Sequence, residues 1–213
     1  MKENKKNFFL SCILFALSII IALVFYDKLP YKIPLHYNFD WQADFYAKKI
    51  NALLFVVGFM VLIYLALYFI LSLDPKKYRH DKNYKNIILL SIPILNLLII
   101  VLTIWKNYNE NLQIGRILIG LIAIFIGISG IFLPKIKRNY TLGIRTPWAL
   151  EDENVWKKTQ KFAGIFLILT ALLSLIGLVF STKIASYLLV GSLILSFVLT
   201  YLYSYLTYRK YGK

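Results

Sequence analysis

Few residues in this chain have the types and spacing that catalysis or metal binding requires. The chain has two histidines and one cysteine. His36 lies near Asp40 and Asp44, but three convergent metal ligands cannot be assembled from these positions. A hydrogen-bonded histidine in a surface loop is the favoured interpretation, and a pH-sensitive contact to a peptide stays open because histidine titrates near neutrality. The sequence has no phosphate-binding loop and no catalytic motif, so we predict no enzymatic activity, no cofactor and no metal.

The polar cluster that most strongly suggests a function is Arg145 with Thr146 and Trp148, within the basic and aromatic segment 139–164. A guanidinium fork beside an indole face can hold a protein or peptide partner. The same residue types also suit a membrane boundary, where Arg145 would hold phosphate headgroups and Trp148 would mark the interface. Residue types alone leave these two interpretations open.

The polar segments are separated by six apolar runs that are long enough to cross a bilayer. About 20 residues suffice, because a helix rises about 1.5 Å per residue and the hydrocarbon core is roughly 30 Å thick. Only 16% of the residues are charged, whereas a soluble domain has roughly 25%. In lipid the backbone must bond internally, so the runs must be helices. The sequence predicts an all-α polytopic integral membrane protein, a single membrane domain over residues 1–213, with spans at 8–25, 50–73, 87–105, 114–133, 162–180 and 184–205.

The net charge of +15 follows the predicted topology and not nucleic-acid binding. Of the 25 Lys and Arg residues, 18 lie in the N-terminal segment, residues 74–86, residues 134–161 and the C-terminal tail. Basic and less basic connections therefore alternate, which is the positive-inside pattern. Six spans with both termini in the cytoplasm satisfy this pattern. We expect the basic loops to face anionic lipid on the cytoplasmic side and predict no direct nucleic-acid contact.

The predicted spans contain few polar groups. Asn96, three residues after Pro93, is predicted to make an interhelical hydrogen bond, worth about 0.6 kcal/mol on average. A kinked helix that lines a polar pathway is the alternative, but the spans lack the acidic, lysine or histidine residues of a proton relay. Four glycines of the fourth span are expected to allow close helix packing inside the molecule: Gly115, Gly120, Gly127 and Gly130.

Two long connections are expected on opposite sides of the membrane. Residues 26–49 should form a compact extracytoplasmic flap, because Pro30 and Pro34 disfavour helix and its many aromatic rings suit the membrane–water boundary. Residues 134–161 should face the cytoplasm. In this second loop Thr146-Pro147 suits a helix start, and the acidic run that follows suits a helix N-terminus. We therefore expect an interfacial amphipathic helix that runs into the fifth span.

Two motifs in these loops resemble a known family. The string Gly-Ile-Arg-Thr-Pro-Trp at 143–148, followed by Val-Trp-Lys-Lys-Thr at 155–159, resembles the signature of the SdpI family, bacterial membrane proteins that confer immunity to a secreted killing peptide. Loop 26–49 resembles a motif of leucine-proline and histidine-aromatic-asparagine that often precedes this signature. Its matching residues here are Leu29, Pro30, Pro34, His36 and Asn38, with Asp44 downstream.

Two positions depart from the family pattern. Glu151 stands where the family commonly has a serine able to cap the helix, which weakens the expected N-cap. Gln160 stands where a histidine is common, so a role that depends on that histidine does not carry over.

The resemblance implies an immunity protein of the bacterial cell membrane that protects its host from a membrane-active peptide toxin. In the best-described member, the protein also draws a cognate transcriptional repressor to the membrane when toxin is sensed. The outer loop would then meet the peptide and the inner loop the repressor, and toxin binding would have to favour one of two arrangements. A small-molecule transporter or channel and a structural membrane subunit are the alternatives. The expected partner-binding residues are Gly143, Arg145, Thr146, Pro147, Trp148, Trp156, Lys157 and Thr159 in the inner loop, and Pro30, Pro34, His36, Asn38, Trp41 and Asp44 in the outer loop.

Overall fold

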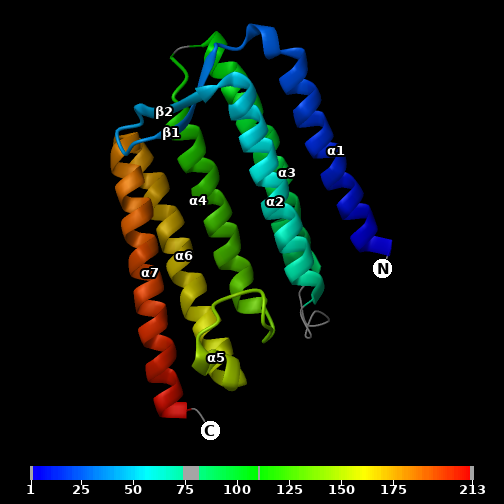
Figure 1. The fold of residues 1–213 in the computed structure, drawn as a ribbon. Coiled ribbons are helices and arrows are strands. Elements are labelled where there is room, and N and C mark those ends of the chain that lie inside the picture. The colour runs from blue at the N-terminus through cyan, green and yellow to red at the C-terminus, as the bar shows by residue number, and fades with distance from the viewer. Residues whose placement is uncertain (1, 74–81, 110, 212–213) are drawn as a thin grey trace. The chain divides into compact units, whose positions relative to one another are not determined.

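The computed structural model describes residues 2–73, 82–109 and 111–211 (Figure 1). Residues 74–81, part of the basic connection predicted between the second and third spans, lie outside the described residues. The described part contains six helices that are long and apolar enough to cross a membrane. They are α1 (Lys2–Val24), α2 (Lys49–Leu73), α3 (Lys82–Tyr108), α4 (Ile114–Phe132), α6 (Glu153–Phe180) and α7 (Thr182–Tyr211).

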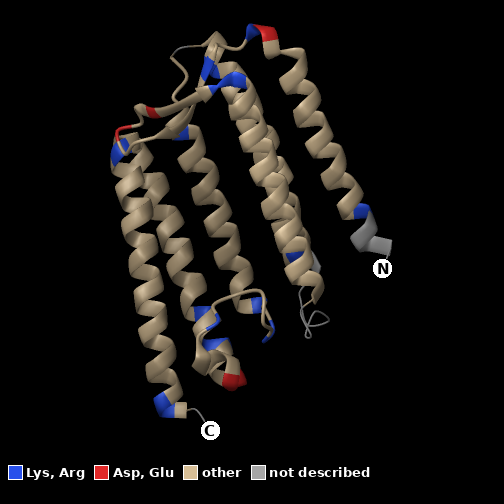
Figure 2. Cartoon of the chain, in the orientation of Figure 1, with Lys and Arg blue, Asp and Glu red and all other residues tan. Residues whose placement is uncertain are grey.

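These helices confirm the predicted helical membrane fold and its six spans. Large apolar side chains cover their outer surfaces; Leu62 of α2, for example, is 66% exposed and Val179 of α6 is 77% exposed. In lipid such exposure costs nothing, because hydrocarbon chains are as apolar as the side chains themselves. Charged residues lie at helix ends and in the connections (Figure 2). The cytoplasmic orientation of the termini stays a prediction.

The chain divides into two compact units. The first unit contains α1, the short 3-10 helix η1 (Tyr26–Lys28), strands β1 (Lys32–Tyr37) and β2 (Ala43–Lys48), α2 and α3. The second unit contains α4, the 3-10 helix η3 (Leu133–Lys135), α5 (Pro147–Glu151), α6 and α7. Each unit therefore holds three long helices and one elaborated connection between its first two long helices.

The antiparallel hairpin β1–β2 departs from the all-α expectation. Pro34 within β1 and Pro30 ahead of it both disfavour a helix. At the start of β1, Lys32 is exposed and Ile33 is buried, as in a half-buried strand. Ile33 is buried together with Leu29 in a cluster that includes Ala22 of α1, Ala52 of α2 and Ile100 of α3. This burial attaches the base of the hairpin to all three helices of the first unit.

Hydrogen bonds also hold the base of the hairpin. The Lys49 ammonium donates to the carbonyl of Tyr26 over 3.0 Å and lies 4.2 Å from the centre of the Tyr26 ring. The side-chain amide of Asn107 in α3 donates to the Lys28 carbonyl over 2.6 Å. The loop predicted to be a compact flap is therefore an ordered hairpin anchored at the ends of α1, α2 and α3.

A buried polar contact joins α1 and α3. Asn96 is completely buried, and its Nδ2 donates to Ser18 Oγ over 2.6 Å. The predicted interhelical hydrogen bond is confirmed. The Oδ1 atom of Asn96 has no hydrogen-bond partner among the described residues. Pro93 lies inside α3, one turn earlier.

In the second unit, glycines bring α4 and α6 into close contact. A Cβ atom added to Gly130 would lie 2.7 Å from the carbonyl oxygen of Gly164, and one added to Gly164 would lie 2.6 Å from that of Gly130. One added to Gly127 would lie 3.2 Å from the methyl group of Ala171. The predicted role of Gly127 and Gly130 in packing within the molecule is therefore confirmed.

Candidate recognition sites

The second unit carries the loop with the family signature, here called the signature loop (residues 136–152), between η3 and α6. Its first turn is built by Asn139, which is completely buried. Asn139 Oδ1 accepts hydrogen bonds from the backbone N–H groups of Thr141 and Leu142 over 2.8 and 2.6 Å. Its Nδ2 donates to the Lys137 carbonyl over 2.8 Å. One asparagine side chain thus replaces the backbone bonds that a helix or sheet would supply.

The second turn depends on Gly143 and Gln160. Gly143 has a φ of +92°, a conformation that favours glycine, and a Cβ atom there would lie 2.7 Å from Gln160 Oε1. The buried Gln160 accepts from the Ile144 N–H over 2.9 Å through Oε1 and donates to the Ile144 carbonyl over 2.8 Å through Nε2. The side-chain amide therefore pairs both backbone polar groups of Ile144. No role for Gln160 was evident from the sequence, whereas in the structure these two hydrogen bonds, here called the clamp, hold the loop to α6.

Three further signature residues face the interior. Trp156 is completely buried, and its indole N–H donates to the Ile136 carbonyl over 2.7 Å. The hydroxyls of Thr146 and Thr159 lie 2.5 and 3.1 Å from Ser204 Oγ of α7. Thr146 also caps α5, because its hydroxyl accepts from the Ala149 N–H over 3.2 Å. These side chains hold the loop to α6 and α7 and are buried from any partner.

The junction between α5 and α6 is also fixed. Asp152 caps α6 by accepting from the N–H groups of Asn154 and Val155 over 2.7 and 2.9 Å. The expectation of a weakened cap at this point was wrong, because the residue after Glu151 supplies the cap. Arg138 donates to the Glu151 carbonyl over 2.6 Å, and its Nε lies 3.4 Å from a Glu153 carboxylate oxygen. Helix α6 thus begins nine residues before the predicted span, and its first turns pack on the loop.

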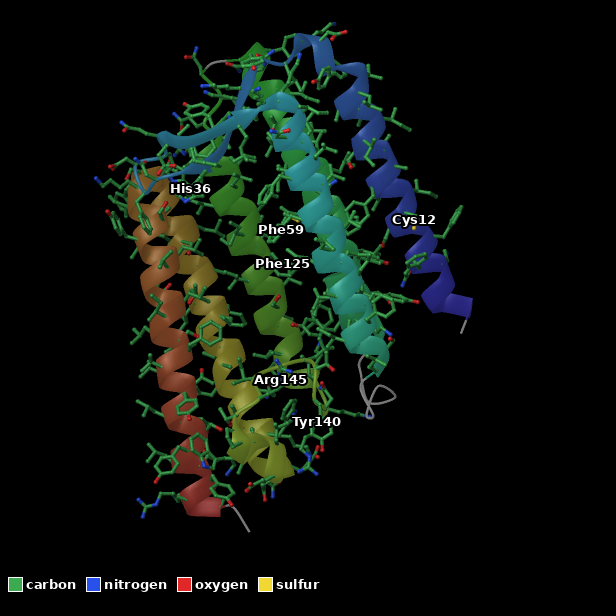
Figure 3. All side chains as sticks on the ribbon, in the orientation of Figure 1. Cys12, His36, Phe59, Phe125, Tyr140 and Arg145 are labelled. Atoms are coloured by element: carbon green, nitrogen blue, oxygen red, sulfur yellow. The ribbon has the colours of Figure 1, made fainter. Side chains whose placement is uncertain are left out.

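The exposed part of the signature loop is small. The Arg145 guanidinium is exposed and donates to the Tyr140 carbonyl over 2.6 Å (Figure 3). Pro147 and Lys157 are also exposed. Trp148 is half-buried, with its ring 5.1 and 5.0 Å from the ring centres of Tyr201 and Tyr205 of α7. The accessible members of the predicted inner set are therefore Arg145, Pro147 and Lys157, with part of Trp148.

The first unit carries the second candidate site, the hairpin. Asn38 Oδ1 accepts from the N–H groups of Asp40 and Gln42 over 2.9 and 3.0 Å, which closes the turn between the strands. Trp41 has a φ of +61°, a rare conformation for a side chain of this size. Its ring lies 6.0 Å from that of Tyr37. Burial and the nearby Tyr46 raise the pKa of the Tyr37 phenol, so this group stays neutral at physiological pH.

The remaining predicted residues of the hairpin lie on its surface. His36 Nδ1 and Asp44 Oδ1 are 2.6 Å apart and both side chains are exposed, which confirms the predicted hydrogen-bonded histidine. Pro30 is exposed ahead of β1, and Pro34 is half-buried within it. Among the residues that the structure describes, no three potential metal ligands come together.

Six apolar helices and two ordered polar connections define a multi-pass membrane protein with candidate recognition surfaces at helix ends. Comparison with known proteins supports this class of protein. The model of the SdpI/YfhL protein family matches residues 135–204, and a model described as a domain of unknown function, DUF1648, matches residues 13–61. The immunity protein SdpI of Bacillus subtilis (strain 168) is 29% identical over 211 residues, which cover 97% of each chain. No solved structure gives a significant match.

These matches confirm the predicted resemblance to the SdpI family: the family model matches the part of the chain that holds the signature loop, and the whole chain is similar to an immunity protein. The first match contains the signature loop with α6 and most of α7, and the second contains the hairpin with about half of α1 and half of α2. Each candidate site thus lies inside a matched region. The similarity to an immunity protein supports a membrane immunity function and, with it, a non-enzymatic role.

Proposed function

We propose that this protein is an immunity protein of the bacterial cell membrane that protects its host from a membrane-active peptide toxin. The observation that carries the proposal is the similarity to the immunity protein SdpI, which extends over 97% of both chains and includes both candidate sites. The signature loop is held by buried hydrogen bonds, and the hairpin by its strand pairing and the buried cluster at its base. Such preorganised surfaces lose less entropy when a partner binds.

In this proposal the hairpin faces the exterior and meets the toxin, while the signature loop and both termini face the cytoplasm. The distribution of basic residues supports the orientation, because 18 of the 25 Lys and Arg residues lie in the segments assigned to the cytoplasm. The seven basic residues of residues 134–161 would also contact anionic lipid.

We further propose that the signature loop reports toxin binding by holding a cytoplasmic transcriptional repressor at the membrane. Its exposed cationic groups support this role. One nitrogen of the Arg145 guanidinium donates to the Tyr140 carbonyl, and the exposed fork offers further donors to a carboxylate. Signalling requires that toxin binding shift the loop between two arrangements with different affinities for the repressor.

Expression in a strain sensitive to a secreted killing peptide tests the immunity function. The wild-type chain should allow survival. If protection as well as signalling needs the signature loop, Arg145→Ala should abolish survival while the amount of membrane protein is unchanged. Lys137→Ala is the matched control, since it removes one exposed positive charge from the same loop. A wild-type chain that gives no survival contradicts immunity to that peptide. Full survival with both Arg145→Ala and Trp148→Ala would remove this cluster from the mechanism.

A further inference from the structure

The two edges of the hairpin differ in what they can bind. The backbone N–H of Lys49 donates to the Tyr31 carbonyl over 2.9 Å, so these two residues form a hydrogen-bonded pair of the antiparallel ladder. Pairs alternate along such a ladder, and Ile33 with Ala47 is the next hydrogen-bonded pair in this register. The backbone groups of the intervening pairs must therefore point outward, away from the partner strand. These pairs are Lys32 with Lys48 and Pro34 with Tyr46.

Proline blocks one of these edges. Pro34 has no N–H group, so the outer edge of β1 lacks a donor at the position opposite Tyr46. Proline on an outer edge is a common means of preventing further strand pairing. The outer edge of β2 keeps the N–H and carbonyl groups of Tyr46 and the N–H of Lys48, whose carbonyl begins the hydrogen-bond ladder of α2. The sheet formed by the described residues has two strands, and β2 is paired only with β1 in it.

The side chains along β2 indicate the chemistry of a third strand. Phe45 and Tyr46 are 58% and 51% exposed and point to opposite faces of the strand, so they would flank an added strand on both sides. Lys32 and Lys48 stand directly opposite each other, and both are exposed. Such a non-hydrogen-bonded pair brings two side chains close together, and like charges opposite each other are destabilising. An acidic group next to this lysine pair would relieve the repulsion.

We infer that the outer edge of β2 is a peptide-binding site that accepts an extended peptide as a third strand, through the backbone groups of Tyr46 and Lys48. The peptide carries apolar side chains against Phe45 and Tyr46 and an acidic group or carboxyl terminus next to Lys32 and Lys48. Strand addition combines main-chain hydrogen bonds for affinity with alternate side chains for specificity. The identification of this peptide with a toxin rests on the proposed function.

The substitution Tyr46→Pro tests the edge. It removes one outward N–H but leaves the ladder to β1 intact, because the Tyr46 N–H does not point toward β1. Tyr46→Ala removes the ring and keeps the N–H. Binding of the killing peptide used in the survival experiment is measured with the full-length chain in phosphatidylcholine nanodiscs.

Tyr46→Pro should weaken peptide binding about tenfold, from loss of a main-chain hydrogen bond and the bulk of the ring, while Tyr46→Ala, which keeps the N–H, stays within about threefold of the wild type. Bound peptide should slow hydrogen exchange at the Tyr46 and Lys48 amides but not at Lys32. Continued protection of the Ala47 amide in Tyr46→Pro shows that the hairpin remains folded.

The outcomes separate this site from the immunity function. If Tyr46→Pro allows survival and binds the peptide as tightly as the wild type does, strand addition is overturned and the immunity function stands. If the wild-type chain binds the peptide and Tyr46→Pro does not, the strand site is supported. If the wild-type chain then gives no survival, immunity to that peptide is contradicted. Affinity that falls in Lys48→Gln but not in Tyr46→Pro shows a charged surface instead of a strand site. A wild-type chain that neither binds nor protects overturns both proposals.

Discussion

The clamp between Gln160 and Ile144 gives the sharpest prediction about the signature loop. Gln160→Leu keeps most of the side-chain volume and removes both hydrogen bonds, which measure 2.9 and 2.8 Å. Each such bond contributes about 1 kcal/mol net. Their loss should therefore favour local opening of the loop by about 2 kcal/mol, or about 30-fold in the opening equilibrium.

Hydrogen exchange at the Ile144 amide measures this opening in the full-length protein in nanodiscs. Gln160→Leu should speed exchange about 30-fold. Gln160→Glu should speed it further, because it buries a charge and places a carboxylate oxygen against the Ile144 carbonyl. Gln42→Leu is the control, since Gln42 is exposed and its described hydrogen bonds use only its backbone. A wild-type exchange rate in Gln160→Leu would refute the clamp.

Three further predictions concern packing and turns. Gly130→Leu should prevent α4 from packing on α6, because even a Cβ atom would lie 2.7 Å from the Gly164 carbonyl oxygen. The yield of folded protein in detergent should therefore fall, and a normal yield would contradict the close contact. Asn96→Leu should change the free energy of unfolding by only about 0.6 kcal/mol, because one membrane-buried hydrogen bond is lost together with an unpaired oxygen. A loss of several kcal/mol would contradict this prediction. Asn38→Ala should destabilise the hairpin by about 1–2 kcal/mol, because the turn loses two hydrogen bonds. Hydrogen exchange at the Gln42 amide should become faster, and an unchanged rate would show that the turn does not need this side chain.

The spans were predictable because the bilayer fixes their length and composition. The start of α6 ahead of its apolar run was predicted, as a helix that runs into the fifth span, but the extension of α7 to Tyr211 was not. These extensions are polar, and their stability comes from contacts with the signature loop that apolar patterning does not reveal. The glycine contact between α4 and α6 was predictable in kind because closely packed membrane helices need small residues.

The two loops were predictable only in part. The signature motif located the inner loop, but three of its residues, Thr146, Trp156 and Thr159, are buried and hold the loop together. Gln160 was missed because its partner is a backbone group 16 residues away. One signal was present: Gln160 follows Trp156 by four residues, so both lie on one helix face. The hairpin was missed because its alternating run is short and contains Pro34, and nothing in the sequence indicates the positive φ of Trp41.

The proposed mechanism depends most directly on the hairpin and the signature loop facing opposite sides of the membrane. Single cysteines at Gln42 and Lys137, two exposed positions, are introduced into a Cys12→Ser background and treated with a membrane-impermeant thiol reagent in intact cells. We predict that Gln42→Cys is labelled in intact cells and that Lys137→Cys is labelled only after the cells are permeabilised. Equal labelling of both positions in intact cells would contradict a protein that binds a peptide outside and signals inside.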